Sequence, residues 1–271
     1  YMTEIWNLFL FQPLVSALVL FWKFFGDLGV SIVVLTIIIR TILIPLTLPA
    51  MRAQKKMAEL APEIKRLKEK HASDKQKFAQ AQMELYKKAG ANPAAGCLPM
   101  IVQFVILIAL YQAFLQVLQT NGTDVLTKIN ETVYPFLQLP SNFNLDFSFL
   151  YLNLSKPDLI HVAGLPLPGI FLILAAISQF FSGKMMAPQI KAEEKEAKKT
   201  PGKSDDMMVA MQSQMMYLFP AMTIFIGYGF PSGLVVYWFI FSAYQLIQQY
   251  FISGWGGLTP WAVKLNLIKN G

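Results

Sequence analysis

Five apolar blocks, each close to the length of a membrane-spanning helix, constrain this chain more than any other feature. A helix needs about 20 predominantly apolar residues to cross a bilayer. The blocks cover 29–48, 97–118, 165–181, 215–230 and 233–252. Only 14% of the 271 residues are charged, whereas soluble domains carry about a quarter. The sequence therefore predicts an all-α membrane protein with five transmembrane helices.

The blocks divide the chain into predicted spans and connections. The order is an N-terminal extracytoplasmic or interfacial amphipathic helix (1–27), a first span (28–51), a cytoplasmic αα-hairpin (52–92), a second span (96–118), an extracytoplasmic connection (119–164), a third span (165–183), a cytoplasmic loop (184–212), a fourth span (213–230), a fifth span (233–252) and a cytoplasmic tail (253–271). The first segment is assigned to the interface because its apolar run, 14–25, is short; an additional span is the alternative. Pro45 and Pro49 predict a kink or an end of the first span. Ser73 or Asp74 is expected to cap the second arm of the hairpin.

The distribution of lysine and arginine predicts the orientation. Basic residues are frequent in the predicted hairpin and in the 184–212 loop, whereas the 119–164 connection contains only Lys128 and Lys156. The positive-inside rule then places the hairpin, the loop and the C-terminus in the cytoplasm and the N-terminus outside. An N-terminus outside needs an upstream segment to carry it across. Because the chain begins with Tyr1, we expect a signal peptide or a further N-terminal span before it.

The residue types needed for metal, redox or covalent chemistry are scarce. The single cysteine is Cys97, and the two histidines, His71 and His161, lie far apart in polar segments. A metal site or a Cys/His nucleophilic site is therefore not expected. The sequence lacks a phosphate-binding glycine loop, and the predicted spans lack a credible acid–base pair. We expect no cofactor and no enzymatic activity, with an intramembrane enzyme as the lowest-ranked alternative.

Arg40 is the one charged residue in the first apolar block. It lies about 17 Å along the helix from Gly29, which is near the middle of a bilayer. An arginine there costs about 3 kcal/mol or more. The other predicted spans contain no Asp, Glu, Lys or His between their ends, which excludes a salt bridge within the five spans. Two interpretations remain: a functional polar groove, or an arginine hydrogen-bonded to glutamine and carbonyl groups.

A series of short motifs, in this order, resembles the YidC/Oxa/Alb family of membrane-protein insertases, and specifically its bacterial YidC type. The motifs are Gly29-Val-Ser-Ile-Val-Val-Leu-Thr-Ile-Ile-Ile-Arg40 with Ile44-Pro-Leu-Thr47, then Leu85-Tyr-Lys-Lys88, Asn92-Pro-Ala-Ala-Gly-Cys-Leu-Pro99, Gln103, Ala109-Leu-Tyr111, Leu152-Asn-Leu-Ser-Lys-Pro-Asp158, Phe230-Pro-Ser-Gly-Leu234, Tyr237-Trp238 and the 245–249 stretch. The resemblance covers about 13–252. The chain departs from the family in two respects: the large extracytoplasmic domain of Gram-negative members does not occur in these residues, with a position upstream of Tyr1 as the alternative, and the 119–164 connection is longer.

The resemblance implies a function and a site. In the family, the matching arginine lies in a hydrophilic groove and attracts acidic extracellular segments of a substrate. Polar candidates for the groove wall here are Thr36, Gln103, Ser178 and Gln179, each with helix packing as the plainer interpretation. Trp238 matches an aromatic position that faces the groove, with ordinary packing as its alternative. The implied activity is insertion without nucleotide hydrolysis, in the bacterial cytoplasmic (inner) membrane.

The expected partners follow from the same considerations. Nascent membrane proteins would be the substrates, and the basic hairpin and tail would contact the ribosome, a targeting factor or the Sec translocon. The net charge of +7 favours anionic lipid over sequence-specific nucleic acid, because the basic residues alternate with acids and not with stacking aromatics. An anion-selective channel or transporter that uses Arg40 as its binding charge is the alternative function.

Overall fold

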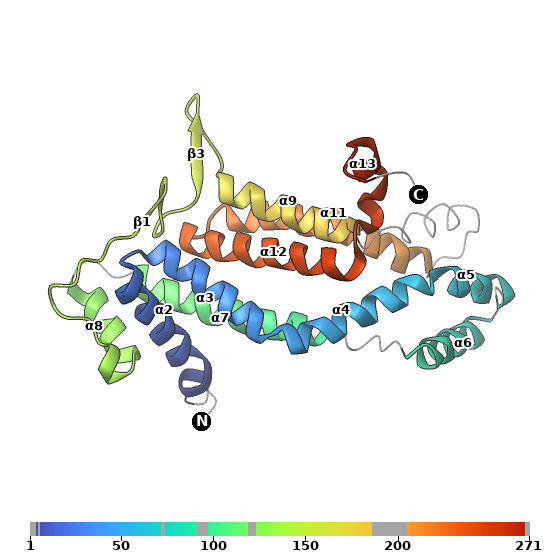
Figure 1. Cartoon of the computed structure of the whole chain (residues 1–271), viewed down its shortest axis with the longest axis horizontal. Helices are drawn as coiled ribbons and strands as arrows, with labels where there is room; N and C mark the ends of the chain where they lie inside the picture. The colour runs from blue at the N-terminus through green and yellow to red at the C-terminus, as the bar shows by residue number, and fades with distance from the viewer. Residues whose placement is uncertain are drawn as a thin grey trace. The chain divides into compact units, whose positions relative to one another are not determined.

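The computed structural model describes residues 4, 6–71, 74–90, 97–118, 123–185 and 205–268, and these residues are mostly helical (Figure 1). The elements are η1 (Asn7–Phe11), α2 (Gln12–Phe25), α3 (Leu28–Ile42), α4 (Ile44–Glu59), α5 (Ala61–Lys70), α6 (Lys75–Lys88), α7 (Cys97–Leu118), α8 (Thr123–Thr132), η3 (Pro135–Leu137), β1 (Ser148–Phe149), β2 (Leu152–Asn153), β3 (Leu159–Val162), β4 (Leu165–Pro168), α9 (Ile170–Met185), α11 (Asp205–Gly227), α12 (Ser232–Ser253), η4 (Gly256–Leu258) and α13 (Thr259–Lys264). The helical character confirms the predicted all-α class in its main feature. Most of the predicted 184–212 loop, together with Ser73 and the 92–96 motif, lies outside the described residues.

The chain forms two compact units. The first unit comprises Tyr1–Ile42, Ile101–Ala176 and Met222–Tyr244. The second comprises Leu43–Met100, Ile177–Ala221 and Gln245–Gly271.

The first helix begins earlier than the sequence predicted. A π-helical turn, Asn7–Phe11, runs directly into α2, which gives a helical stretch of 19 residues, Asn7–Phe25. Pro13 lies at the start of α2. Proline has no amide hydrogen to donate to the preceding turn, and the wider π turn there tolerates the missing hydrogen bond. The premise that this segment is too short to span is therefore wrong. Its interfacial location stays a prediction.

The first predicted span consists of two helices. α3 ends at Ile42 and α4 begins at Ile44, and α4 continues to Glu59, into the range predicted for the hairpin. Pro45 falls in the first turn of α4, where a missing amide hydrogen costs little, so the break lies before it. Pro49 is inside α4 and does not end it.

Length and hydropathy identify few complete spans among the described residues. Asn7–Phe25 is the one helical stretch that meets both criteria alone, and Leu28–Ile42 and Ile44–Met57 meet them only when counted together. Ile101–Ala113, Ile170–Met185 and Met216–Gly227 are apolar but shorter. The count of five spans stays a prediction.

The third predicted span starts as a strand. Leu165–Pro168 is β4, and α9 begins only at Ile170. The apolar composition of 165–168 suggested a helix, but Pro166 and Pro168 alternate with the leucines and cannot donate the hydrogen bonds of a helix interior. β4 instead pairs with β3. The described part of the 119–164 connection contains α8, the 3₁₀ turn η3, the β1–β2 hairpin and the first strand of the β3–β4 hairpin.

The fourth predicted span also has different ends. α11 starts at Asp205, within the predicted 184–212 loop, and ends at Gly227. The second and fifth predicted spans correspond to α7 and α12 within one or two residues at each end.

The core of the first unit forms where α2 packs on α3. Trp22 is 2% exposed, and its ring meets Phe143 edge-on at 5.3 Å between centroids. Gly26 ends α2 with a φ of 72°, a left-handed conformation that suits glycine. Asp27 then accepts a hydrogen bond from the amide of Val30 at 2.8 Å and starts α3. This two-residue connection joins two helices that pack on each other.

A buried carboxylate ties the β-hairpins to α9 in the first unit. Asp158 is 0% exposed and accepts hydrogen bonds from the Tyr151 hydroxyl at 2.8 Å and the Leu172 amide at 3.1 Å. The Tyr151 hydroxyl also accepts from the Ile170 amide at 3.0 Å. A side chain at Gly169 would overlap this carboxylate. Burial, together with the hydrogen bond to Asp158, raises the pKa of Tyr151 to about 12.

The second unit contains α5 and α6, which contact each other. Asp74 caps α6 by accepting a hydrogen bond from the Lys77 amide at 3.1 Å, which confirms one of the two predicted caps. That hydrogen bond holds the pKa of Asp74 below its usual value. The cytoplasmic location of this pair of helices stays a prediction.

The chain end packs on α9 in the second unit. Trp261 of α13 stacks beneath the Lys184 ammonium, 3.0 Å from Nζ to the ring centroid, and meets Phe181 edge-on. Gly256, with a φ of 45°, lies so close to the Met185 carbonyl that a side chain there would overlap it. The 253–271 tail therefore has a short ordered part, through α13.

Candidate functional site around Arg40

Arg40 lies on the buried face of α3. It is 7% exposed. Thr36 and Ile32, one and two turns earlier, are 2% and 3% exposed. Residues four apart share one side of a helix, so the packing of that side also carries the arginine inward. Local sequence therefore supplies the charge, and helix periodicity determines its burial.

Aromatic rings of α12 cover the guanidinium group. Arg40 Cζ is 4.1 Å from the centroid of the Phe241 ring and 5.3 Å from that of Tyr244. Both distances are within the range of a cation–π contact, which gains strength when water is excluded. Tyr237, Phe241 and Tyr244 follow at spacings of four and three residues, so they form one stripe on α12.

The hydroxyls of this stripe have polar partners on neighbouring helices. Gln103 Nε2 on α7 donates to Tyr237 Oη at 2.6 Å. Thr41 Oγ1 on α3 is 3.0 Å from Tyr244 Oη. Two tyrosines of α12 are thus linked by hydrogen bonds to two different helices of the first unit. The arrangement can hold the Arg40 side chain in one orientation.

The Thr36 hydroxyl forms its hydrogen bond within its own helix, α3. Its Oγ1 donates to the Ile32 carbonyl at 2.6 Å. A small cavity of about 10 Å³ lies beside it. The cavity is lined by Leu18, Ile32, Leu35, Thr36, Ile39, Leu110 and Tyr237. This volume is close to the smallest that holds one water, so the interior beside Thr36 is well packed.

The other candidate residues lie elsewhere. Trp238 is next to Tyr237 in sequence but about 100° away around the helix, and its ring lies 6.4 Å from that of Phe230. Phe230 in turn packs on Tyr111 of α7. Ser178 is buried and Gln179 half-buried on α9, and both belong to the second unit. The structure therefore brings Arg40, Thr36 and Gln103 to the same α12 stripe and puts Trp238 in a neighbouring aromatic cluster.

Sequence reasoning missed the residues that contact Arg40 most closely. Phe241 and Tyr244 were not among the candidates, although with Tyr237 they repeat at helical spacing. That spacing was the available signal. It was hidden because apolar and aromatic residues occur on every side of α12.

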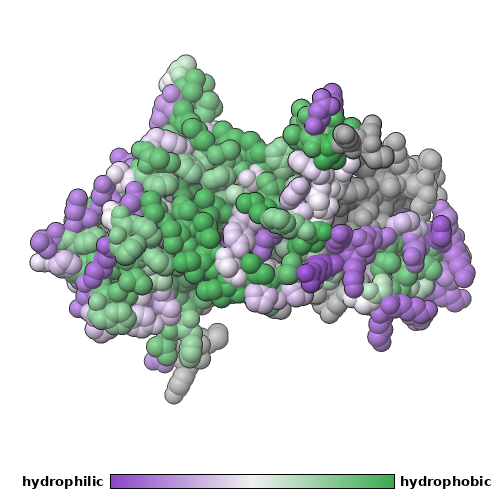
Figure 2. All heavy atoms as spheres, in the orientation of Figure 1, coloured by the Kyte–Doolittle hydropathy of each residue, from purple (hydrophilic) through white to green (hydrophobic). Residues whose placement is uncertain are grey.

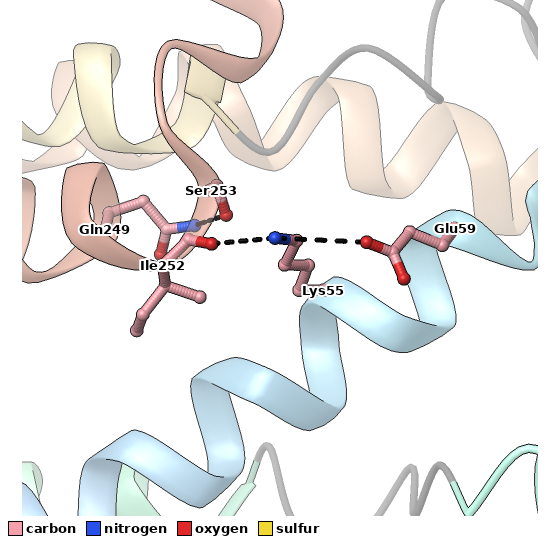
Figure 3. Close-up of polar contacts among 5 residues, drawn as sticks. All are labelled: Lys55, Glu59, Gln249, Ile252 and Ser253. Atoms are coloured by element: carbon pink, nitrogen blue, oxygen red, sulfur yellow. Dashed lines mark hydrogen bonds and ion pairs between the residues drawn. The ribbon is translucent and has the colours of Figure 1, made fainter.

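A second cation contacts α12 within the second unit (Figure 3). Lys55 Nζ on α4 donates to the Ile252 carbonyl at 2.9 Å and lies 4.0 Å from the Glu59 carboxylate. Gln249 Nε2 donates to Ser253 Oγ at 2.8 Å one turn away. The last carbonyls of a helix lack intrahelical donors and carry partial negative charge. Lys55 therefore caps the end of α12.

The described part of the chain does not contain a candidate metal site. There, no group of three or more His, Cys, Asp or Glu side chains is arranged to hold a metal ion. The chemistry available at Arg40 is binding: a guanidinium surrounded by rings and hydroxyls attracts an anion and presents it with directional donors.

Comparison with known proteins gives consistent matches. Residues 4–256 match the family model described as 60Kd inner membrane protein. The chain is 36% identical over 230 residues to a protein of Fusobacterium nucleatum subsp. nucleatum named membrane protein insertase YidC, covering 85% of this chain and 88% of that protein. Proteins with the same name from Methylobacterium sp. and Rickettsia massiliae are 31% and 32% identical over 98% and 92% of this chain. The match spans 37% and 39% of those two proteins.

Proposed function

Because the chain belongs to the YidC/Oxa family of 60Kd inner membrane proteins, we propose that it inserts integral membrane proteins into the bilayer and helps them to fold. The observation that carries the proposal is Arg40, a cation 7% exposed on an apolar helix and covered by two aromatic rings. A charge so placed is costly in a membrane protein and is typical of a functional site. The names of the relatives support the same function.

The mechanism rests on the binding chemistry of the guanidinium. An acidic segment of a substrate would form a bidentate, charge-assisted pair with Arg40, whose side chain is largely shielded from bulk water. Thr36, Gln103 and Trp238 of the first unit are the residues proposed to accompany Arg40 along a hydrophilic groove, whereas Ser178 and Gln179 of the second unit stay candidates from the sequence alone. Apolar segments of the substrate then partition into lipid, and their transfer free energy, together with the membrane potential, drives the reaction without nucleotide.

The proposed setting is the bacterial inner membrane, with the N-terminus outside and the C-terminus inside. Nascent membrane proteins are the proposed substrates. The basic surface of α5 and α6 supports contact with anionic lipid, the ribosome, a targeting factor or the Sec translocon.

Reconstitution tests the proposal directly. Liposomes containing the wild-type protein, Arg40→Lys or Arg40→Ala would receive a single-span substrate with a short acidic tail. We expect Arg40→Ala to slow insertion roughly 10- to 100-fold, because a charge-assisted hydrogen bond contributes about 1.5–3 kcal/mol. Arg40→Lys should retain part of the activity, since it keeps the charge but loses the bidentate geometry.

A substrate with a neutral tail is the matched control. Insertion of the substrate with the neutral tail should depend much less on Arg40. Equal dependence for both tails would reject carboxylate capture, and wild-type insertion equal to that of empty liposomes would reject the insertase proposal. Anion flux that disappears in Arg40→Ala, with no insertion, would instead identify a channel.

A further inference from the structure

One face of the β3–β4 hairpin in the first unit is entirely aliphatic. Ile160 pairs with Leu167 and Val162 with Leu165. These four side chains share a face, because residues two apart in a strand point the same way. The opposite face carries Leu159, His161, Pro166 and Pro168.

This aliphatic face is exposed. Val162, Leu165 and Leu167 are 52%, 66% and 45% exposed. A two-stranded hairpin is at best marginally stable alone in water, because it needs another layer on its apolar face. In Figure 1 the hairpin extends away from the first turn of α9, and the same projection is largely green in Figure 2. A surface of this kind indicates a binding partner for the hairpin.

The base of the hairpin is fixed to the rest of the first unit. The Gly169 amide donates to the Asp158 carbonyl at 2.8 Å, and the Tyr228 hydroxyl donates to the Pro166 carbonyl at 3.0 Å. Gly169 is the only residue between β4 and α9. The hairpin is therefore held at the start of an apolar helix.

Exposed apolar side chains continue from the hairpin onto that helix. Ile170, Ile173 and Leu174 of α9 are 49%, 41% and 37% exposed. Spacings of three and four residues put them along one side of α9. In a bilayer this exposed side of an apolar helix faces lipid, and the hairpin directly precedes that helix in the chain.

The composition of the hairpin selects among partners. Residues 159–168 contain no Asp, Glu, Lys or Arg, and His161 is on the opposite face. A charged peptide therefore finds no complementary group. Pro166 and Pro168 remove two amide donors from β4, which disfavours addition of a further strand at that edge. A lipid surface requires neither charges nor strand donors.

We propose that the β3–β4 hairpin is a membrane anchor, which inserts its aliphatic face, Ile160, Val162, Leu165 and Leu167, into the lipid interface where α9 begins. Aliphatic side chains gain free energy on leaving water for acyl chains. The anchor would hold the start of α9 at a set depth. This proposal requires that the protein resides in a membrane, and it does not depend on the role proposed for Arg40.

Depth-dependent fluorescence quenching tests the anchor. The single native cysteine is removed by Cys97→Ser, and an environment-sensitive fluorophore is attached at Leu165→Cys. His161→Cys, on the opposite face of the same hairpin, is the matched control. In liposomes of neutral phospholipid we expect blue-shifted emission at 165, quenched by lipids that carry a quencher near the headgroup. Emission at 161 should be less shifted and less quenched.

Several outcomes would overturn the anchor. Solvent-like, unquenched emission at both positions would show that the face is outside the lipid. A blue shift at 165 that disappears when the protein is diluted in lipid would indicate a second copy as the partner, and a shift that requires added substrate would indicate the substrate. In a second variant, a label at Leu167→Cys combined with Leu165→Asp should show reduced quenching, and unchanged quenching would also reject the anchor.

Discussion

The two units differ in how they hold charged side chains. Two charged groups of the first unit are buried: Arg40 is 7% exposed and Asp158 is 0% exposed. The second unit leaves comparable groups in contact with solvent, since the side chains of Lys55 and Asp74 are 43% and 40% exposed. The comparison is between like groups: Arg40 and Lys55 are the cations, and Asp158 and Asp74 are the carboxylates that cap helices.

The difference lies in the contacts that each group needs. A buried charge is costly unless hydrogen bonds or rings replace its water. Asp158 accordingly has the Tyr151 hydroxyl and a backbone amide, and Arg40 has the rings of α12. Lys55 and Asp74 keep part of their hydration, so each needs fewer protein contacts. Substitutions in the first unit should therefore have larger effects than the matching substitutions in the second.

The largest effect is expected at Asp158. Asp158→Ala leaves the Tyr151 hydroxyl and the Leu172 amide without their acceptor and should destabilise the protein by about 3 kcal/mol. Thermal unfolding in detergent measures this change. Asp158→Asn is the control, because it keeps the shape and one acceptor, and it should cost less. A loss no greater than that of Asp74→Ala would contradict the comparison.

A smaller effect is expected at Phe241. Phe241→Leu removes the ring beneath the Arg40 guanidinium, and a desolvated cation–π contact contributes about 2 kcal/mol. Phe239→Leu is the matched control, since Phe239 lies on the same helix and packs on Phe171. Unfolding free energies from chemical denaturation compare the two. If the free energy of unfolding falls equally in both variants, the Phe241 ring contributes packing alone and no cation–π stabilisation of Arg40.

The cap at Asp74 should show a pH dependence. Its pKa is lowered by the hydrogen bond from the Lys77 amide, so the folded state favours the carboxylate. The stabilisation is therefore complete well above the ordinary value of 3.8 and is lost as the pH falls below it. Amide hydrogen exchange at the start of α6, normalised to Asp74→Asn, measures the loss. Parallel changes in the two proteins would contradict the prediction.

The smallest effect is expected at Glu59. Its contact with Lys55 is 4.0 Å long and exposed, and such a pair on one helix contributes about 0.3–0.5 kcal/mol. Glu59→Gln should thus change thermal unfolding little. Lys55→Met should cost more, because it also removes the donor to the Ile252 carbonyl. If Glu59→Gln lowers thermal stability more than Lys55→Met does, and the loss does not depend on salt, then the contact with Glu59 and not the hydrogen bond to the Ile252 carbonyl is the main role of Lys55.

The sequence predicted the features that depend on neighbouring residues. The family, the helical class, the extent of α7 and α12 and the Asp74 cap all follow from local composition, motifs and spacing. It failed where local signals conflicted. Apolar composition at 165–168 suggested a helix, but the alternating prolines and the pairing with β3 produced a strand. The short apolar run after Pro13 hid a helix that begins at Asn7.

At the candidate site the same division holds. Sequence alone determined that an arginine would lie within an apolar helix, because that requires only the residues around position 40. Tertiary structure decided which groups surround it. The stripe of Tyr237, Phe241 and Tyr244 comes from the other end of the chain, and only the packing of α12 against α3 selects that side of an all-round apolar helix. Long-range packing is cooperative, whereas composition and periodicity are local.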